Sequence, residues 1–200
     1  CIVVGSNFRF GFQRSGNLEL LQKLGQKLGF CAEPFRQKNA SGSPVSSSRI
    51  RELIKSGDVH SAAQLLRRPY AIRGEVVHGD GRGRHIGLPT ANLEVWQEKL
   101  LPADGVYAAR AFFGEERAAL VSIGTRPTFY QDAKLRTIEA HLLEFEGDIY
   151  GQSMTLHLLE RLRGEERFES ADALMAQIAK DIKKSRKVFS NDARKRNLPA

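Results

Sequence analysis

The stretch YAIRGEVV, residues 70–77, decides the fold that we expect for most of this chain. Its residues fall into two alternating sets, with Tyr70, Ile72 and Val76 in one and Arg73 and Glu75 in the other. Successive side chains of a β-strand point to opposite faces of a sheet, so this period of two predicts a strand.

The residues that follow continue this strand-like pattern. Glycine-bearing turns separate several further candidate strands, at residues 106–113, 117–122, 138–145 and 154–159. Five or more antiparallel strands of this length favour a small closed barrel, because closure leaves no exposed sheet edge. A helix is expected over residues 171–189, with Ser170 as its N-cap. The predicted fold class is therefore mainly β.

The residues that precede the stretch alternate between strands and helices instead. Asn17 is placed to cap a helix that Gly29 ends, and Asp58 to cap a second one that Pro69 stops. The change of pattern places a domain boundary near Arg67. We predict an α/β domain over residues 1–66, a barrel domain over 67–190 and a basic tail over 191–200.

The formal net charge of +8 raises the question of a nucleic-acid partner. Residues 180–196 hold eight Lys or Arg and two Asp, so this segment carries +6 and the rest of the chain only +2. Cations near the C-terminus of a helix interact favourably with the helix dipole. We therefore interpret these charges as a solvated helix face and expect no nucleic-acid partner.

Composition also limits where the protein works. No apolar run approaches the roughly 20 residues that span a bilayer, and no leader peptide is visible, so we expect no membrane partner. Cys1 and Cys31 cannot form a disulfide framework, and we expect two reduced thiols in a cytoplasmic protein. The chain does not begin with Met and its first residues resemble a strand, so we expect an N-terminal portion to be missing.

A glycine-rich loop follows the first strand of the barrel domain. Its glycines leave the backbone free to fold around a ligand, and its two arginines suit phosphate oxygens: Gly79, Gly81, Gly83, Gly87, Arg82 and Arg84. The loop is neither a Walker A loop nor a dinucleotide fingerprint, because the spacing of its residues differs from both. Without further signals, a long glycine hairpin explains it equally well.

The next motif is the tetrapeptide PTAN, which begins at Pro89. Thr90 and Asn92 lie two residues apart, so in an extended chain their side chains share a face. A hydroxyl and an amide carbonyl are oxygen ligands that suit Mg²⁺ together with phosphates. Taken alone, the tetrapeptide is better explained as an ordinary strand start after a proline.

The run from Gly83 to Leu93, GRHIGLPTANL, resembles the signature of riboflavin kinases. The resemblance continues in order along residues 102–108, 121–129, 138–151 and 158–168, and the final helix completes it. It covers residues 67–189, the length of a whole kinase domain, and several blocks in the right order make coincidence an inadequate explanation.

This resemblance implies a six-stranded Greek-key barrel that transfers the γ-phosphate of ATP to riboflavin and yields FMN and ADP. It implies that Thr90 and Asn92 hold Mg²⁺ and that Glu139 is the base for the ribityl 5′-hydroxyl. It implies flavin contacts for Arg161 and Arg163. The implied ATP site comprises Gly79, Gly81, Arg82, Gly83, Arg84, Gly87 and Pro89.

The residues themselves leave other roles open. From the pattern alone, a position on the solvent face of an edge strand is the simpler interpretation of Glu139, and only the family resemblance reverses it. The two arginines could pair with Glu165 or Glu166. For His141, on the same strand face as Glu139, a packing or hydrogen-bonding role is the simpler interpretation. The alternative functions are a flavin-binding module without catalysis and a basic nucleic-acid-binding protein.

The first 66 residues resemble part of the FAD synthetase domain of bacterial bifunctional enzymes, through residues 4–11 and 45–51. Hydroxyls and a cation at a helix start suit an anion, which makes Ser46, Ser47, Ser48 and Arg49 candidates for the adenylyltransferase site. Asn7 is a further candidate for this site and stands where the family usually has Asp. The family's first strand and its His-x-Gly-His segment are not found, so we expect a remnant and a chain that makes FMN but no FAD.

Overall fold

The structure is a computed structural model that describes residues 1–5, 7–35, 39–40, 43–79, 88–125 and 136–196. Contacts between residues divide the chain into two compact units, Cys1–Ser47 and Ser48–Ala200.

The smaller unit contains a two-stranded parallel sheet and a helix. Its elements are β1 (Ile2–Gly5), the short 3-10 helix η1 (Phe12–Arg14), α1 (Leu18–Leu28), β2 (Ala32–Phe35), β3 (Asn39–Ala40) and β4 (Ser43–Pro44). The Asn17 side chain accepts a hydrogen bond from the Leu20 N–H at 3.0 Å, and Gly29 has a left-handed backbone with φ of 74°. Both predicted ends of this helix are confirmed.

Cys1 and Cys31 form a disulfide in this unit, so the prediction of two free thiols is wrong. The parallel pairing of β1 with β2 places Ile2 opposite Ala32, and the Ile2 N–H donates to the Cys31 carbonyl at 2.7 Å. The two cysteines precede these strands and come within 4.5 Å between Cα atoms, a separation that a disulfide can bridge. The register of the two strands, not the spacing in the sequence, brings them together.

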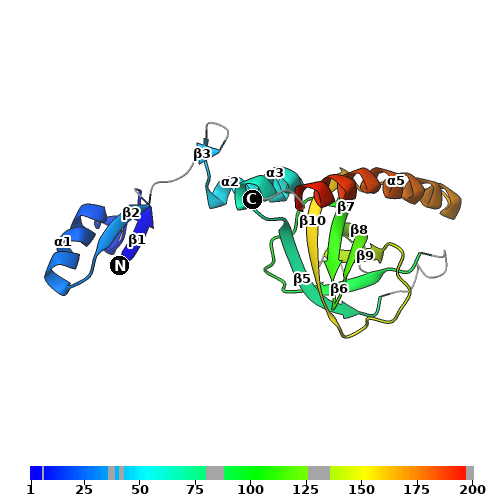
Figure 1. The fold of residues 1–200 in the computed structure, drawn as a ribbon, viewed down its shortest axis with the longest axis horizontal. Helices are drawn as coiled ribbons and strands as arrows, with labels where there is room; N and C mark the ends of the chain where they lie inside the picture. Colours follow the sequence, from blue (N-terminus) through cyan, green and yellow to red (C-terminus); the bar gives the residue numbers. More distant parts are fainter. Residues whose placement is uncertain (6, 36–38, 41–42, 80–87, 126–135, 197–200) are drawn as a thin grey trace. The chain divides into compact units, whose positions relative to one another are not determined.

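The larger unit is a closed barrel of six antiparallel strands (Figure 1). Its elements are α2 (Ser47–Ser56, which starts at the division between the units), α3 (Val59–Leu66), β5 (Tyr70–Val77), β6 (Ala91–Val95), β7 (Gly105–Phe112), β8 (Glu116–Thr125), β9 (Arg136–Leu142), β10 (Ser153–Arg163) and α5 (Ala171–Arg196). The strand order is β10-β5-β6-β9-β8-β7, and β7 pairs with β10 to close the ring. The predicted mainly β class with a C-terminal helix is confirmed.

The alternation of residues 70–77 sets the inside and the outside of this barrel. Ile72 and Val76 are buried in the core, whereas Arg73 and Glu75 are exposed. The same core receives Tyr107 from β7 and Leu156 from β10, both fully buried. The core therefore lies inside the ring of strands.

Helix α3 belongs to the barrel by its packing. Asp58 caps it by accepting from the Ser61 N–H at 3.0 Å. Val59 and Ala62 have no exposed surface, α3 packs against β5 and β10, and Val59 is part of the barrel core. The contacts therefore divide the chain after Ser47, whereas the change of pattern in the sequence places the boundary near Arg67.

Several predicted ends differ from the structure, and β8 and β10 continue to Thr125 and Arg163, beyond the predicted residues 122 and 159. Strand β9 ends at Leu142, because Glu144 takes a positive φ of 54° and turns the chain, so the predicted continuation to residue 145 is wrong. Helix α5 continues to Arg196 and takes in the first part of the predicted tail, where Asp192 accepts from Arg110 Nε at 3.0 Å. Ser170 caps this helix through the Ala173 N–H, as expected.

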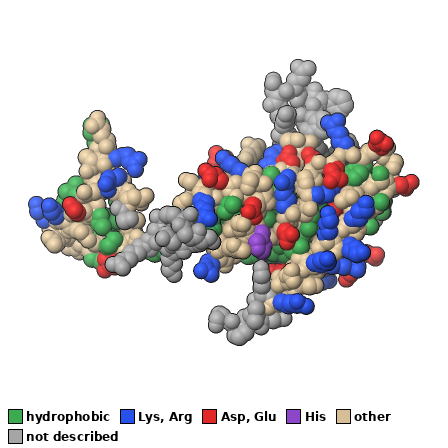
Figure 2. Space-filling view, turned by 90° about the horizontal axis from the view of Figure 1, so that it is seen from above, with side chains coloured by type: hydrophobic (Ala, Val, Ile, Leu, Met, Phe, Trp, Pro, Cys, Tyr) green, Lys and Arg blue, Asp and Glu red, His purple; other side chains and the backbone are tan. Residues whose placement is uncertain are grey.

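Charged side chains of both signs cover the visible face of the larger unit. Figure 2 shows Lys and Arg side chains interspersed with Asp and Glu over this face. Among the described residues, no helix is both long and apolar enough to cross a membrane.

Candidate active site

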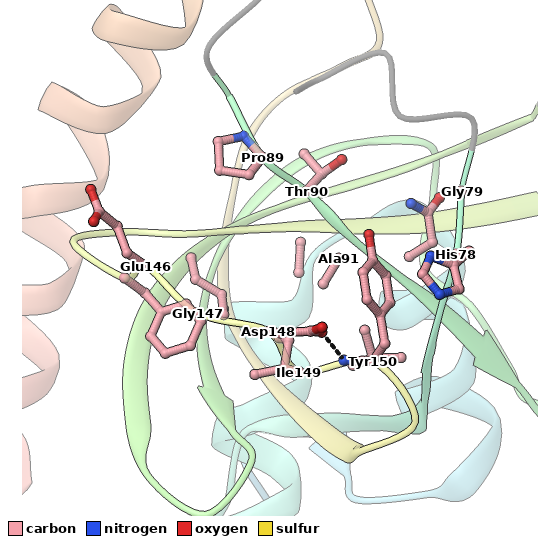
Figure 3. A pocket seen from close by; sticks show the side chains of 15 residues that line it. His78, Gly79, Pro89, Thr90, Ala91, Glu146, Gly147, Asp148, Ile149 and Tyr150 are labelled. Carbon is pink, nitrogen blue, oxygen red and sulfur yellow. Dashed lines mark hydrogen bonds between the residues drawn. The ribbon is translucent and has the colours of Figure 1, made fainter. Parts of the chain in front are cut away.

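A cavity of about 720 Å³ opens at one end of the barrel (Figure 3). Its apolar lining comes from strand residues that otherwise face the core and from the segment after β9: Val76, Ala91, Ala140, Leu142, Phe145 and Ile149. Ala91 and Ala140 lie directly opposite each other in the pairing of β6 with β9. Because both side chains are single methyl groups, the barrel is not filled at this end. The volume lies within the range of small-molecule sites.

Aromatic and polar groups form the rim of the cavity. The His78 and Tyr150 rings stack with their centroids 3.7 Å apart. The Asp148 carboxylate accepts a hydrogen bond from the Tyr150 N–H at 3.0 Å and so fixes the turn that presents this ring. Figure 3 shows Tyr150 beside His78, with Glu146 on the other side of the cavity. The rim combines flat rings with carboxylates.

Three of the predicted site residues meet beside this cavity. Asn92 on β6 lies directly opposite Glu139 on β9 in the strand register. Thr90, which immediately precedes β6, donates a hydrogen bond from Oγ1 to Glu139 Oε2 at 3.4 Å. Ala91 and Ala140 are buried, and Asn92 and Glu139 alternate with them along their strands and are half-buried. Of the three predicted residues, Thr90 and Asn92 line the cavity.

Gly79 makes room for this arrangement. A Cβ atom added at Gly79 would lie 2.1 Å from Asn92 Nδ2, so only glycine lets the Asn92 amide lie against the backbone here. A hydroxyl, an amide and a carboxylate are thus gathered in one place. All three offer the oxygen ligands that Mg²⁺ takes, so the residues present fit this ion.

The other residues of the predicted ATP site divide into two groups. Gly79 and Pro89 both line the cavity. Five lie outside the described residues: Gly81, Arg82, Gly83, Arg84 and Gly87.

Arg161 and Arg163, predicted to contact the flavin, lie on β10 and do not line this cavity. Arg161 Nη2 donates to the Asp104 carbonyl at 2.6 Å. Arg163 Nε donates to Asp181 Oδ2 at 2.8 Å, and this carboxylate on α5 is almost completely buried. In the structure these arginines therefore fasten a loop and the last helix to the barrel, and their flavin contacts remain a prediction.

The candidates for the adenylyltransferase site lie near the start of α2. Ser47 and Ser48 begin the helix, Ser46 precedes it and Arg49 lies in its first turn. Asn7 is an exposed residue of the smaller unit, in the turn after β1. Their role also remains a prediction.

Sequence reasoning missed the segment after β9 as part of the site. Phe145, Glu146, Gly147, Asp148 and Tyr150 all line the cavity. Asp148 could have indicated a turn here, because an Asp side chain often accepts a hydrogen bond from the backbone N–H two residues further along the chain. The structure also stacks the His78 ring on Tyr150 at the rim of the cavity.

Comparison with known proteins identifies the larger unit. The family model described as riboflavin kinase matches residues 66–189. The chain belongs to the riboflavin kinase family. A second model, described as FAD synthetase, matches residues 1–49.

Relatives and solved structures agree with this membership of the riboflavin kinase family. A bifunctional riboflavin kinase/FMN adenylyltransferase of Escherichia coli is 40% identical over 191 residues, which cover 94% of this chain and 60% of that protein. A riboflavin kinase structure from Trypanosoma brucei matches with a TM-score of 0.50 and 28% identity, over 62% of this chain and 81% of that one.

A Streptococcus pneumoniae structure titled as a macrolide-efflux protein matches with a TM-score of 0.81 and 33% identity, over 91% of this chain and 58% of that one. The chain thus spans about 60% of the length of the curated relatives that it matches.

Proposed function

We propose that the barrel transfers the γ-phosphate of ATP to the ribityl 5′-hydroxyl of riboflavin and releases FMN and ADP. The observation that carries this proposal is the meeting of Thr90, Asn92 and Glu139 beside a cavity of about 720 Å³. A flavin-binding module without catalysis needs neither a proton acceptor nor a set of hard oxygen ligands. Because ATP is the donor, we propose that the reaction takes place in the cytoplasm.

The chemistry that we assign to the site is an in-line displacement. The 5′-hydroxyl oxygen of riboflavin attacks the γ-phosphorus, the bond from this phosphorus to the β–γ bridging oxygen breaks, and ADP leaves. The Glu139 carboxylate accepts the proton of the attacking hydroxyl. Phosphoryl transfer requires little covalent work from a protein, so positioning and charge stabilisation supply most of the acceleration.

Thr90 and Asn92 are the residues that we propose to hold Mg²⁺ with the phosphates of ATP. The ion, when bound, supplies positive charge that offsets the charge on the phosphate oxygens. Thr90 and Asn92 orient the donor next to Glu139, and Gly79 leaves space for the Asn92 amide. His78 and Tyr150 offer flat rings on the rim for a planar base.

The proposal is tested by incubating the chain with riboflavin, ATP and Mg²⁺ and separating the flavins by chromatography. We expect FMN and ADP in equal amounts, and strongly reduced FMN from a Glu139→Gln variant purified in the same way. Riboflavin that binds but is not converted would instead indicate a flavin-binding module. FAD among the products would show that the first 66 residues contribute adenylyl transfer as well.

A further inference from the structure

The segment that carries Thr90 is held by a side chain that the proposed chemistry does not use. His141 lies on β9, two residues beyond Glu139, and therefore points to the same face of the strand. Its ring nitrogen Nδ1 lies 2.9 Å from the carbonyl oxygen of Pro89. Two neighbouring side chains of β9 thus contact two consecutive residues, since Thr90 Oγ1 bonds Glu139.

In the part of the chain that the structure describes, the backbone pairing of β6 with β9 stops short of this segment. Strand β6 begins at Ala91, and its register with β9 joins Ala91 to Ala140 and Asn92 to Glu139. Proline has no N–H to donate to a sheet ladder. The contact from His141 to the Pro89 carbonyl therefore attaches the residues before β6 to β9, beyond the point where the register of the two strands ends.

We propose that His141 is a positioning residue, which fixes Thr90 at its distance from Glu139 by holding the carbonyl immediately before it. This inference rests on the proposed function of Thr90 and Glu139. A carbonyl oxygen only accepts hydrogen bonds, so Nδ1 carries the proton, both in the neutral ring and in the imidazolium. Misplacement of a reacting group by about 1 Å can cost on the order of 10²-fold in rate.

The contact is exposed, so its loss has a small effect on stability and a larger effect on geometry. This difference separates a positioning role from a merely structural one. The decisive variants are His141→Asn and His141→Gln, because the Asn amide nitrogen takes nearly the place of Nδ1 and the Gln amide nitrogen that of Nε2. His141→Leu removes the donor and keeps an apolar body of similar size.

The experiment measures steady-state kinetics of FMN formation and thermal melting for the three variants and the parent chain. We expect the Leu and Gln variants to lose about 10–100-fold in kcat, with KM for riboflavin within about twofold of the parent. We expect Asn to recover most of the loss and all melting temperatures to stay within about 3 °C. His60→Leu is the matched control, since His60 is an exposed histidine on α3 that contacts Gln64.

A second measurement does not depend on turnover. The NMR signals of the His141 ring report which nitrogen carries the proton, and the Thr90 amide signal reports its backbone position. We expect a protonated Nδ1, and a shifted Thr90 signal in the Leu and Gln variants but not in the Asn variant. Parental kcat in the Leu variant, equal losses in Asn and Leu, or an unmoved Thr90 signal in Leu would each overturn the proposal. If the parent makes no FMN, the proposed function fails. The NMR measurement would still show whether His141 holds the backbone at Thr90 in place.

Discussion

Helix α3 offers the sharpest test of how this chain is organised. The match to the riboflavin kinase family begins at residue 66, and the boundary near Arg67 that the sequence indicates would allow residues 1–66 to be removed without harm to the barrel. In the structure, however, Val59 and Ala62 of α3 are completely buried, and Val59 is part of the barrel core. We therefore expect two truncations to behave differently: removal of residues 1–47 is tolerated, whereas removal of residues 1–66 is not.

The magnitude follows from the side chains that α3 buries. Burial of a valine side chain contributes about 1.5–3 kcal/mol, and each further methyl group about 0.8 kcal/mol. Loss of Val59 and Ala62 alone therefore costs roughly 2–4 kcal/mol, a large share of the 5–15 kcal/mol that typically stabilises a domain, and the longer truncation also removes the buried Ile54 of α2. For a domain of this size, each kcal/mol lowers Tm by about 2–4 °C, so we expect a decrease of roughly 10 °C.

The assay compares the two truncated chains by circular dichroism during thermal and urea unfolding. Both lack β1, β2 and α1, so the smaller unit does not contribute to either transition. In the full chain, Val59→Ala should lower the free energy of unfolding by about 2 kcal/mol. Gln64→Ala, at an exposed position of the same helix, is the control and should change it by less than about 0.5 kcal/mol.

The reasoning would be refuted if the two truncated chains melted at the same temperature. In that case α3 would not be part of the cooperative unit, and the boundary near Arg67 would be the correct one. A chain without residues 1–47 that failed to fold would also contradict the division after Ser47.

Three further predictions concern the site and its surroundings. Glu139→Gln keeps the shape of the side chain but removes the proton acceptor, and we expect kcat to fall by roughly 10²–10⁴-fold with riboflavin affinity nearly unchanged; loss of affinity at normal kcat would make it a binding residue. Thr90→Ala and Asn92→Ala should each impair turnover and raise the Mg²⁺ concentration needed, and parental behaviour of both across a Mg²⁺ titration would contradict the assignment. Burial raises the pKa of the Tyr107 phenol, so its contribution to stability is complete below about pH 10 and is lost as pH rises through the raised pKa; urea unfolding at pH 9 and 11 should show a smaller decrease for Tyr107→Phe than for the parent.

The sequence by itself determined the features that depend on near neighbours. Asn17 and Gly29 bound a helix in the structure as the capping rules predict, and Asp58 caps the next predicted helix. The alternation in residues 70–77 separates buried from exposed side chains correctly. Such features need only a few consecutive residues, so their physical causes are all visible in a short stretch of sequence.

Only the tertiary structure decided which distant residues meet. Asn92 reaches Glu139 because β6 pairs with β9 in one register, and a shift by one residue would turn Glu139 to the other face. Cys1 reaches Cys31 for the same kind of reason, through the pairing of β1 with β2. Arg163 is fixed by Asp181 from a helix that follows it in the chain. The energy that selects these partners comes from burial and pairing across each folded unit, which no local pattern in the sequence records.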